Sequence, residues 1–228
     1  SVYQKPSVGI LVTGNELVKA GVNLHLRKIY ESNSIMLKVA LQEVGLEKVK
    51  TIQVEDDFKK TKKVLKKCIS QFDMVLVSGG ISVGDYDYVK EALLANDVEE
   101  LFYNINQKPG KPLFFGKKDQ TLVFALPGNP ASSLTCFYVY VLPALKKMLG
   151  LELVHIPKIK RKINVDFQNT TGKSLFLKGF YSDENVEVLE SQSSAMLNTF
   201  AVANGFVFIP YDCSIIKKNQ EVIVLPFK

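Results

Sequence analysis

Short apolar runs alternate with stretches of helical spacing over the first 150 residues. The runs at 8–13, 49–54, 73–78 and 121–126 are rich in branched side chains and predict buried strands. Apolar residues at helical spacing predict helices that begin after Ser32 or Asn33, after Asp56 or Asp57, near Tyr88, and at Pro130 behind an Asn129 cap. Strands that alternate with helices predict a three-layer αβα domain in which helices cover both faces of a mostly parallel sheet.

The pattern changes after Gly150. Residues 151–157 are predicted to form a linker, and period-two alternation follows, for example at 186–189 and 221–225. This alternation between glycine-rich breaks is typical of a small β-rich or barrel-like domain. We therefore expect an α/β domain at residues 1–150 and a β domain at residues 151–228.

Composition limits the cellular compartments in which the chain is expected. Of 228 residues, 46% are hydrophobic, yet no apolar run is long enough to span a bilayer, and the first residues do not resemble a signal peptide. The three cysteines are widely spaced and form no metal-binding or redox motif, which is typical of a reducing compartment. We expect a cytoplasmic protein that binds neither membrane nor nucleic acid.

Net charge does not alter that expectation. The chain carries a formal charge of +6, and six lysines between 59 and 67 contribute to it. Their spacing leaves them on one side of a predicted helix whose other side is apolar, so they are interpreted as a solvated face.

A glycine-rich segment, 78–87, follows the third predicted strand and precedes a helix. Gly79, Gly80 and Gly84 would let backbone N–H groups approach an anion, and Ser78 and Ser82 add hydroxyl donors. A tight turn without a ligand is the alternative reading. Two carboxylates, at positions 85 and 87, favour a phosphate site over an empty turn. Carboxylate and phosphate repel each other, so their proximity is compatible chiefly with a bound Mg²⁺ between them. Asp85 is also a candidate helix cap.

Three further loops, at 13–16, 55–57 and 126–133, follow other predicted strands and should meet the 78–87 segment at the same sheet edge, and a separate lysine-containing turn is a second candidate. Lysines flank a stiff turn at 108–112, and the turn at 126–133 begins a helix whose free amides could face an anion. An exposed surface turn and an ordinary capped helix are the alternatives. Glu16 and Asp56 end two other strand loops, and with Asp87 they could hold a divalent ion.

These segments resemble a known family. The stretches 13–17, 29–33, 54–57, 78–87, 108–112, 126–132 and 192–205 occur in the order and spacing of the molybdopterin molybdenumtransferases, the MoeA and gephyrin E-domain family. The resemblance implies a MogA-like α/β domain followed by a small β-barrel. It also implies two further domains before this part, so we expect the chain to be part of a longer protein, and it implies a homodimer.

The resemblance implies a transferase of molybdenum cofactor biosynthesis. Family members insert molybdate into adenylylated molybdopterin with Mg²⁺ and release AMP. Glu16, Asp56 and Asp87 are the implied catalytic and metal-binding carboxylates. The implied substrate-binding residues are Thr13, Gly14, Ser78, Gly79, Gly80, Ser82, Gly84, Asp85, Lys108, Pro109, Gly110, Lys111, Pro127, Gly128, Asn129, Ser132, Lys178, Ser193 and Ser194.

Departures from the family pattern leave two other functions open. Arg27 stands where glycine is usual, Glu31 replaces a common Asp, Lys178 a frequent Arg and Ala195 a common Gly. One alternative is a non-enzymatic, gephyrin-like scaffold, which would not need the loop carboxylates. The other is a competence-damage-type nucleotide pyrophosphatase, which shares the Ser-Gly-Gly loop but does not predict the segment beginning at Gln192.

Overall fold

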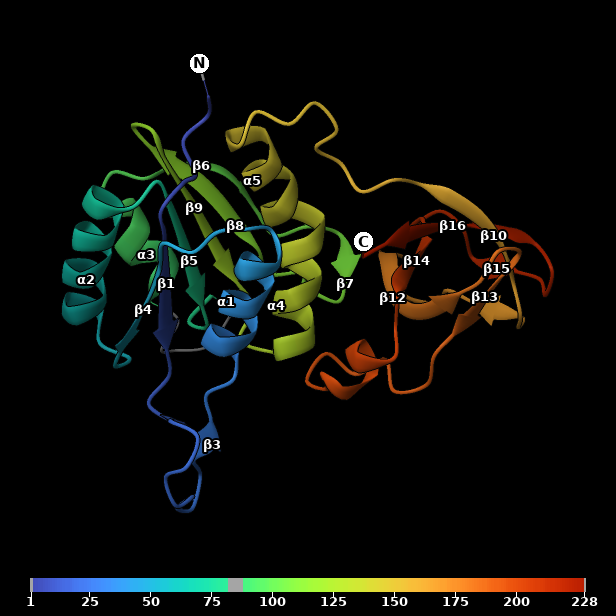
Figure 1. Cartoon of the computed structure of the whole chain (residues 1–228). Coiled ribbons are helices and arrows are strands. Elements are labelled where there is room, and N and C mark those ends of the chain that lie inside the picture. The colour runs from blue at the N-terminus through green and yellow to red at the C-terminus, as the bar shows by residue number, and fades with distance from the viewer. Residues whose placement is uncertain (1, 82–87, 228) are drawn as a thin grey trace.

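The computed structural model describes residues 2–81 and 88–227. A six-stranded sheet with the order β4–β1–β5–β9–β8–β6 forms the centre of the first part (Figure 1). Its strands are β1 (Val8–Thr13), β4 (Val49–Val54), β5 (Met74–Ser78), β6 (Glu99–Tyr103), β8 (Phe114–Lys118) and β9 (Thr121–Leu126). The first four in the spatial order are parallel, and β8 and β6 continue the sheet in antiparallel pairs.

Helices cover both faces of this sheet, which confirms the predicted αβα layers. They are α1 (Asn33–Glu43), α2 (Phe58–Gln71), α3 (Val89–Leu94), α4 (Pro130–Cys136), the π-helical turn η1 (Phe137–Val141) and α5 (Leu142–Met148). In Figure 1, α2 and α3 lie on one face and α1, α4 and α5 on the other. The helix predicted from Pro130 onward is continuous but widens at η1, just before Pro143, whose missing N–H cannot join a regular helical ladder.

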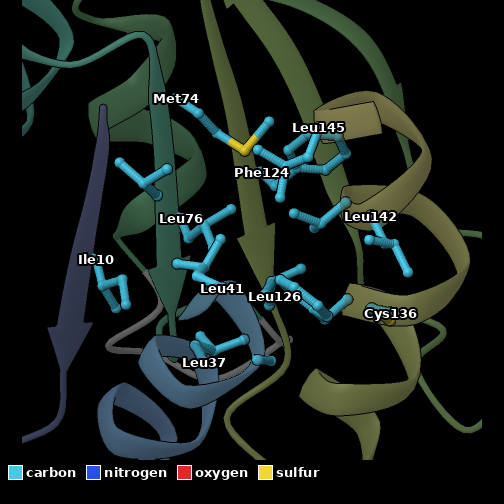
Figure 2. Packing of buried hydrophobic residues seen from close by; sticks show 14 of the residues in the cluster. Ile10, Leu37, Leu41, Met74, Leu76, Phe124, Leu126, Cys136, Leu142 and Leu145 are labelled. Atoms are coloured by element: carbon cyan, nitrogen blue, oxygen red, sulfur yellow. The ribbon is translucent and has the colours of Figure 1, made fainter. Parts of the chain in front are cut away.

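Alternate residues of each central strand face opposite helical layers. In β5, Met74 and Leu76 belong to the core under α1, α4 and α5, whereas Val75 and Val77 belong to the core under α2 and α3. Figure 2 shows the first of these cores, where Leu37 of α1 lies beside the strands. Strand side chains alternate between the two faces of a sheet, so burial on both faces requires the continuous apolar runs seen in the sequence.

The second part of the chain is a closed barrel. Strands β10 (Ile159–Ile163), β12 (Ser174–Tyr181), β13 (Asn185–Val188), β14 (Gly205–Ile209) and β16 (Glu221–Pro226) form it. Their order is β13–β10–β16–β14–β12, and a β12–β13 pairing closes the ring. The remaining elements are short strands and a 3₁₀ turn: β2 (Leu17–Val18), β3 (Ile29–Tyr30), β7 (Gln107–Lys108), β11 (Phe167–Gln168), β15 (Ile215–Ile216) and η2 (Asn198–Ala201).

Aromatic packing and a strand pairing join the barrel to the α/β part. Tyr138 of η1 stacks on Phe227 with ring centroids 4.9 Å apart and meets Phe206 edge-on. Strand β7, which precedes the lysine turn, pairs with β12 of the barrel. Within the described residues, no helix has both the length and the apolar character required to cross a membrane.

Candidate active site

A cavity of about 690 Å³ lies at the carboxyl ends of the parallel strands. Several loops that are far apart in the sequence contribute to it, as the convergence of strand ends predicts. Its lining residues are Val12, Thr13, Gly14, Glu16, Leu17, Ile29, Tyr30, Glu31, Ser32, Asn33, Asp56, Ser78, Gly79, Gly80, Ile81, Pro112, Pro127, Gly128, Asn129, Pro130 and Ala195. Ser82, Gly84, Asp85 and Asp87 were also expected here, and they lie outside the described residues.

The glycines after β5 are required by close backbone approach. Gly79 has φ +92°, and a Cβ there would stand 2.7 Å from the carbonyl oxygen of Thr13. Gly80 has φ +63°, and its Cβ would stand 2.6 Å from a methyl carbon of Val89 and 2.9 Å from the Thr13 hydroxyl. Residues other than glycine rarely adopt this left-handed region. The loop can therefore pack tightly against β1 only with glycine at both positions.

Asn33 connects two walls of the cavity. Its side-chain nitrogen donates to the hydroxyl oxygen of Ser78 at 2.8 Å and to the carbonyl oxygen of Gly128 at 2.7 Å. A carbonyl can only accept, so the atom facing Gly128 must be the amide nitrogen. The first residue of α1 thereby fixes the end of β5 relative to the turn after β9.

Two of the predicted carboxylates line the cavity from neighbouring loops. The Asp56 carboxylate accepts from the backbone N–H of Asn15 at 2.8 Å, and the Asn15 side chain accepts from the N–H of Asp56 at 3.1 Å. This reciprocal pair fixes the loop after β1 against the loop after β4. Asp57, rather than Asp56, caps α2 by accepting from the N–H of Lys60. Asp56 and Glu16 both line the cavity.

Glu31 is a further carboxylate in the lining. It accepts from the N–H of Ser34 at 2.7 Å and also from the Ser34 hydroxyl. It thus performs the capping expected of Ser32 or Asn33, because Ser32 makes no side-chain cap bond. Among the described residues, no three His, Cys, Asp or Glu side chains are grouped closely enough to hold a metal ion.

The lysine turn lies beside the cavity and contributes Pro112 to its lining. Gly110 is buried, where an added Cβ would stand 2.5 Å from the sulfur of Cys136, and Gln107 donates to the carbonyls of Pro109 and Gly110. Lys108 and Lys111 are exposed and are not part of the lining. Their contact with an anion stays a prediction.

The first backbone N–H groups of α4 bond to an acceptor within the chain. The sequence favoured an anion at this helix start, near Ser132, but the carbonyl oxygen of Ser194 accepts from the N–H of Ala131 at 3.0 Å and of Ser132 at 3.3 Å. Asn129 donates to the Ser194 hydroxyl at 3.1 Å. A loop of the barrel therefore supplies the acceptor that was assigned to a ligand.

Lys178 lies outside the lining of the cavity. It is buried in β12 and donates to backbone carbonyls, and neither it nor Ser193 lines the cavity. Burial lowers the pKa of its ammonium group. The donors of this cation are directed at the chain itself, and its direct contact with an anion stays a prediction.

Sequence reasoning missed several lining residues. Asn33 was considered only as a helix cap, and Tyr30, Pro112 and Ala195 received no site role. Pro112 and Ala195 lie far from the strand-end loops in the sequence, and only the fold of the turn and the barrel brings them close. Asn33 had one available signal, since a buried Asn at a helix start beside a glycine loop has polar atoms that require partners.

A mostly parallel sheet with a glycine-lined cavity at its carboxyl edge is the arrangement in which α/β domains commonly bind small molecules. Residues 9–147 match the family model of a probable molybdopterin-binding domain, and residues 160–227 match the MoeA C-terminal region, domain IV. The chain therefore belongs to the family of the probable molybdopterin-binding domain, and its second part is similar to domain IV of MoeA.

Known relatives extend beyond this chain. A protein of Haemophilus influenzae named molybdopterin molybdenumtransferase is 31% identical over 99% of this chain and 57% of its own length. A Mycobacterium tuberculosis protein named molybdopterin molybdenumtransferase 2 is 32% identical over 92% of this chain and 54% of its own. The crystal structure of a Pyrococcus horikoshii MoeA protein superposes with a TM-score of 0.83 at 31% identity, covering 98% of this chain and 55% of that one. The chain spans about half the length of these relatives.

Proposed function

We propose that this chain supplies the substrate-binding part of a molybdopterin molybdenumtransferase. Adenylylated molybdopterin binds in the strand-end cavity, and water attacks its phosphoanhydride, which breaks the P–O bond to the adenylyl group and releases AMP. The two dithiolene thiols then bind molybdenum from molybdate, and the displaced oxygen leaves as water with the thiol protons. Bound Mg²⁺ would neutralise charge on the phosphates. One observation carries the proposal, namely that Glu16 and Asp56 line the same cavity as the Ser78–Gly80 turn. The matches to relatives that carry this activity in their names support it.

The size and lining of the cavity suit an adenylylated pterin. Its volume of about 690 Å³ lies within the roughly 300–1,000 Å³ that is usual for small-molecule sites. The N–H of Gly79 donates to the carbonyl oxygen of Leu126 at 3.3 Å. The N–H of Gly80 has no acceptor among the described residues, and the absence of a side chain there would let a phosphate oxygen approach it. Tyr30 and Leu17 in the lining offer apolar surface to a ring system.

The lining also suits Mg²⁺. This ion takes one or two protein carboxylates and completes its octahedral shell with water and substrate phosphate oxygens. Glu16 and Asp56 would supply those carboxylates, and the ion would neutralise charge between them and the anhydride phosphates. The bond from the N–H of Asn15 holds the Asp56 carboxylate in place at one oxygen. Among the described residues the other oxygen has no hydrogen-bond donor, so it would be available to a ligand.

The test measures adenylylated molybdopterin binding to this chain with and without Mg²⁺, followed by AMP release in the presence of molybdate. Asp56→Asn should weaken Mg²⁺-dependent binding at least tenfold, while Asp119→Asn, at the exposed turn between β8 and β9, should have no effect. Equal binding by wild type and Asp56→Asn, with no response to Mg²⁺, would sink the proposal.

The same experiment separates the alternatives. A nucleotide pyrophosphatase would cleave dinucleotides as readily as the pterin substrate, and a scaffold would bind neither. The match of residues 160–227 to domain IV of MoeA supports the transferase over the pyrophosphatase. We further propose that the protein works in the cytoplasm as a homodimer without nucleic acid or membrane, and light scattering of the purified chain tests the dimer.

A further inference from the structure

Lys178 is a buried cation that has no ionic partner among the described residues. Only 4% of its surface is exposed. The ion pairs found in the described part of the chain do not include it. A buried ammonium group is costly unless polar groups replace the water that it loses. The hydrogen bonds of its side-chain nitrogen therefore indicate which groups stabilise the charge.

Backbone carbonyls of one loop take the place of water around the ammonium group. Its Nζ donates to the carbonyl oxygens of Ser191 at 2.8 Å, Ser193 at 3.3 Å and Met196 at 3.4 Å. An ammonium group has three N–H donors, so these carbonyls can satisfy all of them. Phe200 covers the cation at 5.7 Å from its ring centroid. We call residues 191–196 the docking loop.

Two other side chains attach the docking loop to the barrel. The Gln192 amide accepts from the N–H of Lys178 and donates to its carbonyl, each at 2.9 Å. The Thr199 hydroxyl donates to the carbonyl of Ser191 at 3.1 Å. These contacts fix the start of the loop, at Ser191 and Gln192, to β12 and to the turn η2.

The tip of the docking loop reaches the α/β part of the chain. Ser194 accepts from the N–H groups of Ala131 and Ser132, which are the first amides of α4, and from the side chain of Asn129. Helix amides at this end carry partial positive charge and need acceptors. The next residue, Ala195, lines the cavity.

We propose that Lys178 is a positioning residue that seats the docking loop on the start of α4 and thereby places Ala195 in the cavity wall. The barrel then completes the site through main-chain contacts. The ammonium group acts on the carbonyls of the loop. Its charge strengthens each of these bonds, because hydrogen bonds to an ionised group are roughly twice as strong as neutral ones.

Amide hydrogen exchange tests this role without any ligand. In Lys178→Met, which keeps an apolar stem of similar length but has no charge, the N–H groups of Ala131 and Ser132 should exchange at least tenfold faster. The N–H of Ser133 bonds to Asn129 within the same segment and should change little. Lys158→Met, at an exposed position just before β10, is the matched control and should alter none of these amides.

Two further variants sharpen the test. Lys178→Arg keeps the charge and several N–H donors, so it should retain protection of Ala131 and Ser132. Thr199→Val removes one bond to the Ser191 carbonyl and should raise exchange at the same two amides by a smaller factor, which keeps the idea testable if Lys178→Met does not fold. Unchanged exchange in both Lys178→Met and Thr199→Val would overturn the proposal, and so would equal exchange in Lys178→Arg and Lys178→Met.

The consequence for binding rests on the proposed function. If the cavity takes adenylylated molybdopterin, Lys178→Met should raise its Kd about tenfold by loosening the wall at Ala195. Because the exchange measurement uses no ligand, a failure of the proposed function leaves its outcome unaffected. Normal substrate binding together with normal protection in Lys178→Met would refute the positioning role alone.

Discussion

Replacing Gly79 with Ala perturbs the cavity at its closest backbone approach. The new Cβ would stand 2.7 Å from the Thr13 carbonyl oxygen, at a φ of +92°. The clash is with backbone of a central strand, so no side-chain rotation can relieve it. The left-handed conformation costs a non-glycine residue roughly 1–2 kcal/mol, and overpacking adds roughly 1–3 kcal/mol. We expect Gly79→Ala to lower the free energy of unfolding by about 2–5 kcal/mol.

Urea denaturation followed by circular dichroism measures that loss. Gly128→Ala is the matched control, because Gly128 lines the same cavity but its added Cβ would meet nothing nearer than the Gly79 Cα at 3.7 Å. Gly128 is also absent from the residues with positive φ. Gly128→Ala should therefore change the free energy of unfolding by no more than about 0.5 kcal/mol, as is usual for an exposed position. Equal free energies of unfolding for the two variants would refute the reasoning that close approach to β1 demands glycine at position 79.

Three other predictions concern the frame around the cavity. Arg27 has φ 64°, so Arg27→Gly should remove left-handed strain and raise the free energy of unfolding by about 0.5–1 kcal/mol, and a loss in urea denaturation would contradict this. Asp57 caps α2, so Asp57→Ala should cost about 1 kcal/mol in the same assay. Burial raises the pKa of Cys68 to about 11 and of Cys136 to about 12, so both remain protonated thiols at pH 8 and only the partly exposed Cys213 should react with a thiol reagent before urea is added. Mass spectrometry counts the labelled cysteines, and rapid labelling of Cys68 or Cys136 in the folded protein would be inconsistent with their burial.

The central layers were predictable because their burial leaves a strong pattern. A strand buried on both faces must be largely apolar, as residues 74–77 of β5 are, and the lysine-rich helix shows its exposed face directly. Strand β6 was missed because it is largely exposed at the sheet edge and begins with two glutamates. Strand β8 ends in glycine and two lysines, which weakens its apolar pattern.

The candidate site was predictable to the extent that strand-end loops compose it. Gly79, Gly80, Glu16 and Asp56 follow strands that the pattern identifies, so their convergence follows from parallel topology. The position of Lys178 could not be derived in this way. Whether a lysine faces a ligand or a carbonyl depends on barrel closure and on the path of a loop, and neither leaves a local signal in the sequence.

Backbone geometry accounts for one departure from the family pattern. Arg27 stands where glycine is usual, and its positive φ is the conformation that glycine adopts without strain. The backbone of this loop has therefore kept the glycine conformation with a larger residue in place. No comparable reason follows from the structure for Ala195, beyond its place in the cavity wall.

A crystal structure of this chain with adenylylated molybdopterin and Mg²⁺ tests the central claim most directly. The account predicts ligand electron density in the strand-end cavity, with a phosphate at the backbone of Gly80 and the carboxylates of Glu16 and Asp56 facing the ligand and its Mg²⁺. Ligand density elsewhere, for example in the hollow lined by Phe115 and Met148, with the strand-end cavity occupied only by water, would contradict it.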